Sequence, residues 1–200
     1  MEYFRLRRIA DDSEIFAAML NMRERYPHLP VTGARVIGQD PNDSQRGFHI
    51  DAGSNDGIAP NMAVITEGGL GGMVSRVSPA RSQVISILDP RFSAAVISTR
   101  TEDTGVVSGD IRLMRLGLVR MNHISAAAAI MPGDEIMTSH HSSIFPQGLF
   151  VGTVISIHTN PDGLTRHAII QPSAQATPDA VLVITKDLCE IGGVEIWEDE

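Results

Sequence analysis

Two stretches of the sequence decide the fold: NMAVITEGGLGGMVSRV (Asn61 to Val77) and GDEIMTSHHSSIFPQGLFVGTVISI (Gly133 to Ile157). Each reads as a strand, a turn, the pair Gly-Leu, a glycine and a second strand, so we interpret them as two copies of one β unit. The glycine inside each second strand favours a bulge or sharp bend, which lets a small sheet curl into a barrel. The positions that we match are Gly69-Leu70 with Gly148-Leu149, Gly72 with Gly152, Val74 with Val154 and Val77 with Ile157.

The rest of the chain after Pro30 has the same character. Short runs rich in Val, Ile and Thr alternate with Gly, Pro, Asn and Asp at intervals of ~10 residues, which is typical of an all-β sandwich or barrel. We therefore predict a mainly β fold with two small tandem β-barrels, the architecture of chymotrypsin-like proteases, preceded by a short N-terminal helix. Strands are expected at residues 32–38, 47–52, 62–66, 72–77, 83–88, 94–99, 104–108, 111–120, 135–138, 149–158, 166–171, 180–184 and 193–197.

The expected domains are an N-terminal helical segment (1–30), a first barrel (31–103), a second barrel (104–190) and an acidic C-terminal tail (191–200). In the first segment, apolar residues recur at helical spacing before Pro27. Their stripe either packs on its own chain or pairs with the helix of another copy. The candidate residues for self-association are Phe16, Met19 and Leu20.

Composition narrows the classes of function. The 200 residues carry a formal net charge of −8, and no run of basic residues is long enough to follow a phosphate backbone. Both observations argue against nucleic acid as a partner. Cys189 is the only cysteine, so it forms no intrachain disulfide. No apolar run approaches the ~20 residues that span a bilayer, and the start lacks a signal peptide, so we expect a soluble chain. We expect neither a cofactor nor a metal.

Several motifs, taken in order, resemble one known family. They are ARVIGQDP (Ala34 to Pro41), IDAGSNDG (Ile50 to Gly57), GLGGMV (Gly69 to Val74), Leu88-Asp89-Pro90, IFPQGL (Ile144 to Leu149) and DAVLVI (Asp179 to Ile184). Their series resembles the β region of the bacterial rod shape-determining MreC family over roughly Ala34 to Ile184. Each motif alone is weak, and the order is what is specific.

This resemblance implies a pair of small barrels that self-associates and serves as a non-enzymatic scaffold of the cell-elongation complex, which builds sidewall peptidoglycan. The implied partners are a class B penicillin-binding protein, MreD and, indirectly, MreB and the shape-determining glycosyltransferase. The family lies on the extracytoplasmic face of the inner membrane, anchored by a transmembrane helix and a coiled coil. This sequence contains neither in full.

The IFPQGL loop is the candidate partner-binding site. Pro146 fixes its own φ and Gly148 frees the backbone, so the apolar pair Ile144 and Phe145 is held in a defined turn. These residues either plug a barrel end or protrude as an anchor for a partner. The candidate residues are Ile144, Phe145 and Pro146.

Two other functions remain open. A serine hydrolase would need a nucleophile, a base and an orienting carboxylate, and Ser142 or Ser143 with His140 or His141 supplies only neighbours in sequence. The chymotrypsin-type GDSGG motif is absent, and Gly68 to Gly72 holds leucine where a nucleophile would lie. A glycan-binding module would stack sugars on aromatic rings, but aromatic residues make up only 4% of the chain. Adjacent His140 and His141 have no partner at a metal-ligand spacing.

Overall fold

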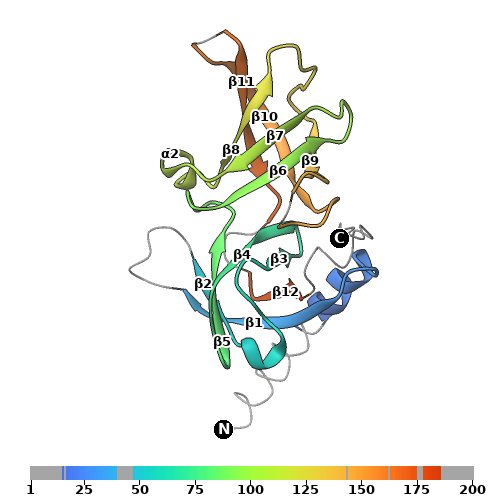
Figure 1. The fold of residues 1–200 in the computed structure, drawn as a ribbon, viewed down its shortest axis with the longest axis vertical. Helices are drawn as coiled ribbons and strands as arrows, with labels where there is room; N and C mark the ends of the chain where they lie inside the picture. The colour runs from blue at the N-terminus through green and yellow to red at the C-terminus, as the bar shows by residue number, and fades with distance from the viewer. Residues whose placement is uncertain are drawn as a thin grey trace, which may run out of the picture.

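The structure is a computed structural model, and it describes residues 15, 17–39, 47–142, 144–161, 163–174 and 178–185. Among these residues the strands form two closed barrels of six strands each, stacked along the long axis of the molecule (Figure 1). The predicted mainly β fold with two barrels and a short N-terminal helix is confirmed.

The first barrel is built from the early strands and the last one. Its elements are β1 (Val31–Gln39), β2 (Phe48–Ile50), the 3-10 turn η1 (Ser54–Asp56), β3 (Ala63–Thr66), β4 (Gly69–Ser78), β5 (Arg81–Ser86) and β12 (Ala180–Ile184). They pair in the order β1-β12-β3-β4-β5-β2 and close on themselves.

The second barrel contains everything between. Its elements are β6 (Ser93–Ser98), β7 (Thr104–Ser108), the one-turn helix α2 (Ile111–Met114), β8 (Val119–Ser125), β9 (Glu135–Thr138), β10 (Phe150–Thr159) and β11 (Thr165–Pro172). They pair in the order β10-β11-β8-β7-β6-β9 and also close. Because closure pairs the outer strands with each other, neither described barrel ends in an open sheet edge.

The sequence repeat corresponds to equivalent hairpins, β3–β4 and β9–β10. The backbone N–H of Asn61 donates to the carbonyl of Val74 at 2.8 Å, and that of Gly133 donates to the carbonyl of Val154, also at 2.8 Å. Asn61 and Gly133 both have positive φ, at 69° and 96°. The two copies therefore begin with the same turn and the same first backbone contact.

Both second strands carry a bulge directly before the matched glycine. The pairing of β4 with β3 skips a residue before Gly72, and the pairing of β10 with β9 skips one before Gly152. A Cβ on Gly72 would lie 2.0 Å from the carbonyl oxygen of Ile85, and one on Gly152 would lie 2.1 Å from that of Gln171. The predicted bulges are present, and only glycine fits beside the neighbouring backbone.

One part of the sequence alignment is out of register. Counting back from these bulges, Phe150 takes the place of Leu70, since Leu70 pairs with Ile65 and Phe150 with Met137. The match of Gly69-Leu70 with Gly148-Leu149 is therefore displaced by one residue. The Gly-Leu letters coincide, but the longer loop of the second copy shifts them along the strand.

Strand pairing divides the chain differently from the expected boundary between residues 103 and 104. Strand β6 pairs with β7 and β9 and belongs to the second barrel, whereas β12 pairs with β1 and β3 in the first. The chain thus leaves the first barrel after β5 and returns to it for β12. Pairing between strands so distant in sequence leaves no local signal.

The expected strand at residues 111–120 is wrong in its first half. Asp110 caps a helical turn there, and its Oδ1 accepts the backbone N–H groups of Arg112 and Leu113 at 2.7 and 3.3 Å. Gly117, at a φ of 71°, then leads into β8. The expected strand at residues 193–197 lies outside the described residues.

A continuous apolar core joins the barrels. One cluster contains Leu70 and Ile87 of the first barrel together with Phe92, Ile136 and Leu149 of the second. A smaller cluster fills the interior of the first barrel. Because one core is shared, burial holds the two barrels against each other. No helix of the described residues is long and apolar enough to cross a membrane.

Candidate partner-binding site

The IFPQGL loop connects β9 to β10 and is closed at its base by Thr138. The backbone N–H of Thr138 donates to the carbonyl of Leu149 at 2.9 Å, and Thr138 Oγ1 accepts the N–H of Leu149 at 2.9 Å. The N–H of Gly148, whose φ is 86°, donates to the carbonyl of Thr138 at 3.0 Å. These bonds fix the position from which the loop projects.

Phe145 lies inside the protein. Its side chain is 1% exposed, and its ring centroid lies 5.5 Å from that of Phe92 in the core shared by the barrels. Ser142 Oγ accepts its backbone N–H at 2.9 Å, and Pro146 is buried beside it. Phe145 and Pro146 therefore plug the junction.

Ile144 differs from its neighbour. It is 37% exposed, although its backbone N–H also reaches Ser142 Oγ, at 3.4 Å. The loop thus presents one aliphatic side chain to solvent on a base that buried groups hold in place. Because the loop backbone is already held by these bonds, less loop entropy is lost when a partner covers Ile144.

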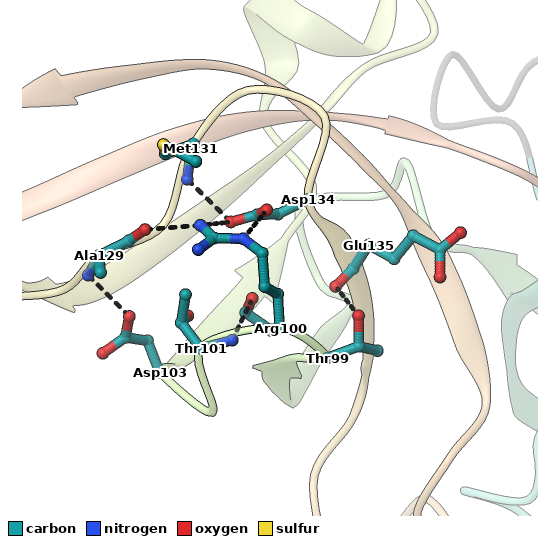
Figure 2. Close-up of polar contacts among 9 residues, drawn as sticks. Thr99, Arg100, Thr101, Asp103, Ala129, Met131, Asp134 and Glu135 are labelled. Atoms are coloured by element: carbon teal, nitrogen blue, oxygen red, sulfur yellow. Dashed lines mark hydrogen bonds and ion pairs between the residues drawn. The ribbon is translucent and has the colours of Figure 1, made fainter.

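An ion pair for which the sequence gives no signal holds the start of β9, at the end of the strand away from the IFPQGL loop. Figure 2 shows Arg100, which follows β6, reaching across to Asp134 with two of its three guanidinium nitrogens, Nε to Oδ1 at 2.6 Å and Nη2 to Oδ2 at 2.8 Å. The same Nη2 donates to the carbonyl of Ala129 at 2.7 Å, and Asp134 Oδ2 accepts the N–H of Met131. Asp103 accepts the N–H of Ala129 at 2.8 Å.

The charges of Arg100 and Asp134 stabilise each other and hold two turns together. The hydrogen bonds from Arg100 hold the pKa of Asp134 below its usual value, and the same contacts raise the pKa of Arg100. The pair ties the β6–β7 turn to the loop that leads into the second repeat. Each residue comes from a separate turn, so sequence order gave no signal for their contact.

The hydrolase candidates do not form a triad in the described part of this loop. Ser142 caps the backbone of Ile144 and Phe145, and Ser143 lies outside the described residues. Ser139 contacts His141, but through Nδ1 at 3.2 Å, and its Oγ also accepts the backbone N–H of His141. In a triad Nε2 faces the serine while Nδ1 faces a carboxylate. A local serine turn explains this pair.

Two further histidines face each other across β10 and β11. The rings of His158 and His167 stack with centroids 5.3 Å apart, and His167 Nδ1 lies 2.6 Å from Asn160 Oδ1. The pKa of His167 is lowered, mainly because its ring is buried. The positive charge of Arg120 and the neighbouring His158 lower it further. Across the described residues, no group of three His, Cys, Asp or Glu side chains is placed to hold a metal ion.

The candidate self-association helix comprises residue 15 and residues 17–25, drawn in blue in Figure 1. Phe16 lies outside the described residues. Met19 is half-buried and faces β1, because a Cβ on Gly33 would lie 3.0 Å from its sulfur. Leu20 is 61% exposed. The helix thus packs on the first barrel through Met19 and leaves Leu20 on its outer side.

Comparison with known proteins identifies relatives of one kind. Residues 36–185 match the family model described as rod shape-determining protein MreC, barrel core. The chain is 28% identical to the cell shape-determining protein MreC of Listeria monocytogenes over 80% of its own length and 54% of the relative. It is also 28% identical to MreC of Caulobacter vibrioides, over 92% of its length and 50% of the relative. The chain spans about half the length of these curated relatives.

Solved structures agree. MreC from Listeria monocytogenes superposes with a TM-score of 0.72 at 25% identity, covering 92% of this chain and 95% of the other. MreC from Pseudomonas aeruginosa gives 0.68 at 25% identity, covering 78% and 99%. The fold is also that of MreC in a complex of penicillin-binding protein PBP2 and MreC from Helicobacter pylori, with a TM-score of 0.65 at 16% identity, covering 79% and 99%.

The family model matches residues 36–185, a range that contains both bulged hairpins and all of the two barrels except the first residues of β1. Three quarters of the sequence is thereby accounted for by one family. The chain belongs to the MreC family of rod shape-determining proteins and contains its barrel core.

Proposed function

We propose that this protein is a non-enzymatic scaffold of the bacterial cell-elongation machinery. It self-associates and binds a class B penicillin-binding protein on the extracytoplasmic face of the inner membrane. Through the wider complex, with MreD and indirectly MreB and the shape-determining glycosyltransferase, it maintains cell shape. The observation that carries this proposal is the family match over the barrel pair.

The fold supports binding through loops and the N-terminal helix. Because every barrel strand has a neighbour on each side, a partner strand cannot simply extend an open sheet edge. Ile144 offers an apolar contact on a base fixed by Thr138 and Ser142. A few side chains that the partner covers completely carry most of the binding energy of an interface. A protein of the same fold from Helicobacter pylori is found in complex with PBP2.

The test is a pull-down with the periplasmic part of a class B penicillin-binding protein. We expect the wild-type chain to retain it and Ile144→Asp to weaken retention, because a carboxylate at the contact must lose its water. The matched control is Leu164→Asp, which places the same charge on a more exposed aliphatic residue of the β10–β11 turn. Equal retention by both variants would remove Ile144 from the contact, and no retention of wild type would contradict partner binding.

Catalysis is tested separately. Labelling with a fluorophosphonate probe marks activated serines, and a scaffold gives none above the denatured protein. Specific labelling that is lost in Ser139→Ala would show that the protein is a hydrolase.

Self-association is measured by sedimentation of wild type and Leu20→Asp, where the proposal predicts a lower average mass for the variant.

A further inference from the structure

The β7–β8 connection carries an exposed surface that the fold does not require. Ile111 and Leu116 are 68% and 70% exposed, among the most exposed large apolar side chains of the described residues. Arg112 and Arg115 are exposed beside them. We call these four residues the α2 patch.

The α2 patch is held in place from below. Asp110 caps the turn, Met114 is buried in the core, and the N–H of Leu118 donates to the carbonyl of Leu113 at 3.1 Å. The exposed aliphatic side chains therefore stand on an anchored turn. An anchored apolar surface flanked by arginines suits binding better than a mobile one, since less entropy is lost.

Charge indicates what kind of surface would cover the α2 patch. The chain as a whole is acidic, with a net charge of −8, while residues 111–116 read IRLMRL and carry two positive charges and no carboxylate. A complementary partner presents carboxylates interleaved with apolar side chains. The guanidinium groups bind such carboxylates in a bidentate geometry.

This sequence contains one such segment itself. Residues Val194 to Glu200 read VEIWEDE, with four carboxylates around Ile196 and Trp197. We call it the acidic segment. We propose that the acidic segment of one copy binds the α2 patch of a second copy, with Trp197 and Ile196 covering Ile111 and Leu116 and the carboxylates pairing with Arg112 and Arg115.

The arrangement of the fold favours a second copy over the same chain. The acidic segment follows β12, whose end pairs with the beginning of β1, as Ile184 lies opposite Val31. In Figure 1 the start of β1 lies beside the N-terminal helix at the right of the first barrel, whereas α2 lies at the left, beside β8 of the second barrel. A contact within one chain would require residues 186–197 to pass from the first barrel to the outer side of the second, which orders more of the chain than a contact between copies does.

This inference rests on the proposed self-association and names a surface for it. The patch and the segment are different surfaces, so their contact is heterologous, and repetition from copy to copy generates rings or open chains. Both contributions are needed in every copy. Removing either surface from all copies therefore abolishes the contact, whereas one intact surface in each of two variants restores a single contact.

The test uses two full-length variants and the fluorescence of Trp197, the only tryptophan. The donor carries Ile111→Ser and Leu116→Ser, so it keeps Trp197 but lacks the patch. The acceptor keeps the patch, lacks tryptophan and has a neutral acidic segment, through Trp197→Phe, Glu195→Gln, Glu198→Gln, Asp199→Asn and Glu200→Gln. When the two variants are mixed, the only pairing left is between the acidic segment of the donor and the α2 patch of the acceptor. A control acceptor also carries Arg112→Gln and Arg115→Gln.

We expect the donor emission to shift to shorter wavelength as acceptor is added, to saturate, and to shift less with the control acceptor or in 0.5 M salt, which screens charge pairs to about a few ångströms. No shift on mixing would overturn the proposal. If sedimentation then still shows wild-type association, the scaffold self-associates through another surface. In wild type, Trp197 emission that stays at shorter wavelength than that of the donor alone, even at high dilution, would assign the contact to a single chain. That result would refute the contact between two copies.

Discussion

Replacing Phe145 and Ile144 separately distinguishes a buried plug from a docking side chain within one loop. Phe145 is 1% exposed and stacks near Phe92, whereas Ile144 is 37% exposed. Phe145→Ala removes a buried ring and leaves a cavity at the barrel junction, which costs ~3–5 kcal/mol in the free energy of unfolding. For a chain of this size that corresponds to a fall of ~6–20 °C in melting temperature.

Ile144→Ala should behave in the opposite way. Its loss from a partly exposed position costs about 1 kcal/mol or less in unfolding. At a partner contact it weakens binding at least ~10-fold, or about 1.4 kcal/mol. Urea denaturation followed by circular dichroism measures the first quantity, and titration of the penicillin-binding protein measures the second. A Phe145→Ala protein that keeps wild-type stability but loses binding would refute our assignment of plug and contact.

Three further predictions concern the scaffold itself. Gly152→Ala places a Cβ 2.1 Å from a backbone carbonyl and should destabilise by ~1–3 kcal/mol or more, whereas Gly38→Ala, with open space around it, should be tolerated in the same urea titration. Because the pKa of His167 is lowered from 6.5, the unfolded chain binds this proton first; stability should fall as pH drops below about 6.5, and less so in His167→Gln. Because the pKa of Asp134 is lowered from 3.8, Asp134→Asn should lower the urea midpoint at pH 7. The difference in midpoint between wild type and variant should shrink as pH falls below about 3.8, where the wild-type carboxylate becomes protonated.

The repeat predicted most of the fold because its signals are local. Glycines at Gly72 and Gly152 mark the bulges, and the positive φ of Asn61 and Gly133 marks the turns that start both copies. Such features depend on a few neighbouring residues, and the sequence therefore displays them. Each barrel contains one copy of this hairpin, β3–β4 in the first and β9–β10 in the second.

What the sequence did not predict depends on distant contacts. The membership of β12 in the first barrel follows from its pairing with β1, far away along the chain. The sequence predicts a strand at the α2 turn because its apolar residues fit either period, and the Asp110 cap that decides the structure is a single side chain. The sequence alone does not decide whether Phe145 is buried, because its ring partner Phe92 comes from another segment.

The sequence also predicts only part of the candidate site. The sequence singled out Ile144, Phe145 and Pro146 together, and the structure buries Phe145 and Pro146 while exposing Ile144. Whether Ile144 contacts a partner stays a prediction, as does the role of Leu20 in self-association. The pair of Arg100 and Asp134 had no sequence signal, since two separate turns bring them together.

Sedimentation velocity of the chain mixed with the periplasmic part of a class B penicillin-binding protein tests the scaffold account most directly. The account predicts a new, faster-sedimenting species that contains both proteins, and self-association of the chain when it is measured alone. Two unchanged boundaries, at concentrations well above micromolar and with the chain monomeric, would contradict it.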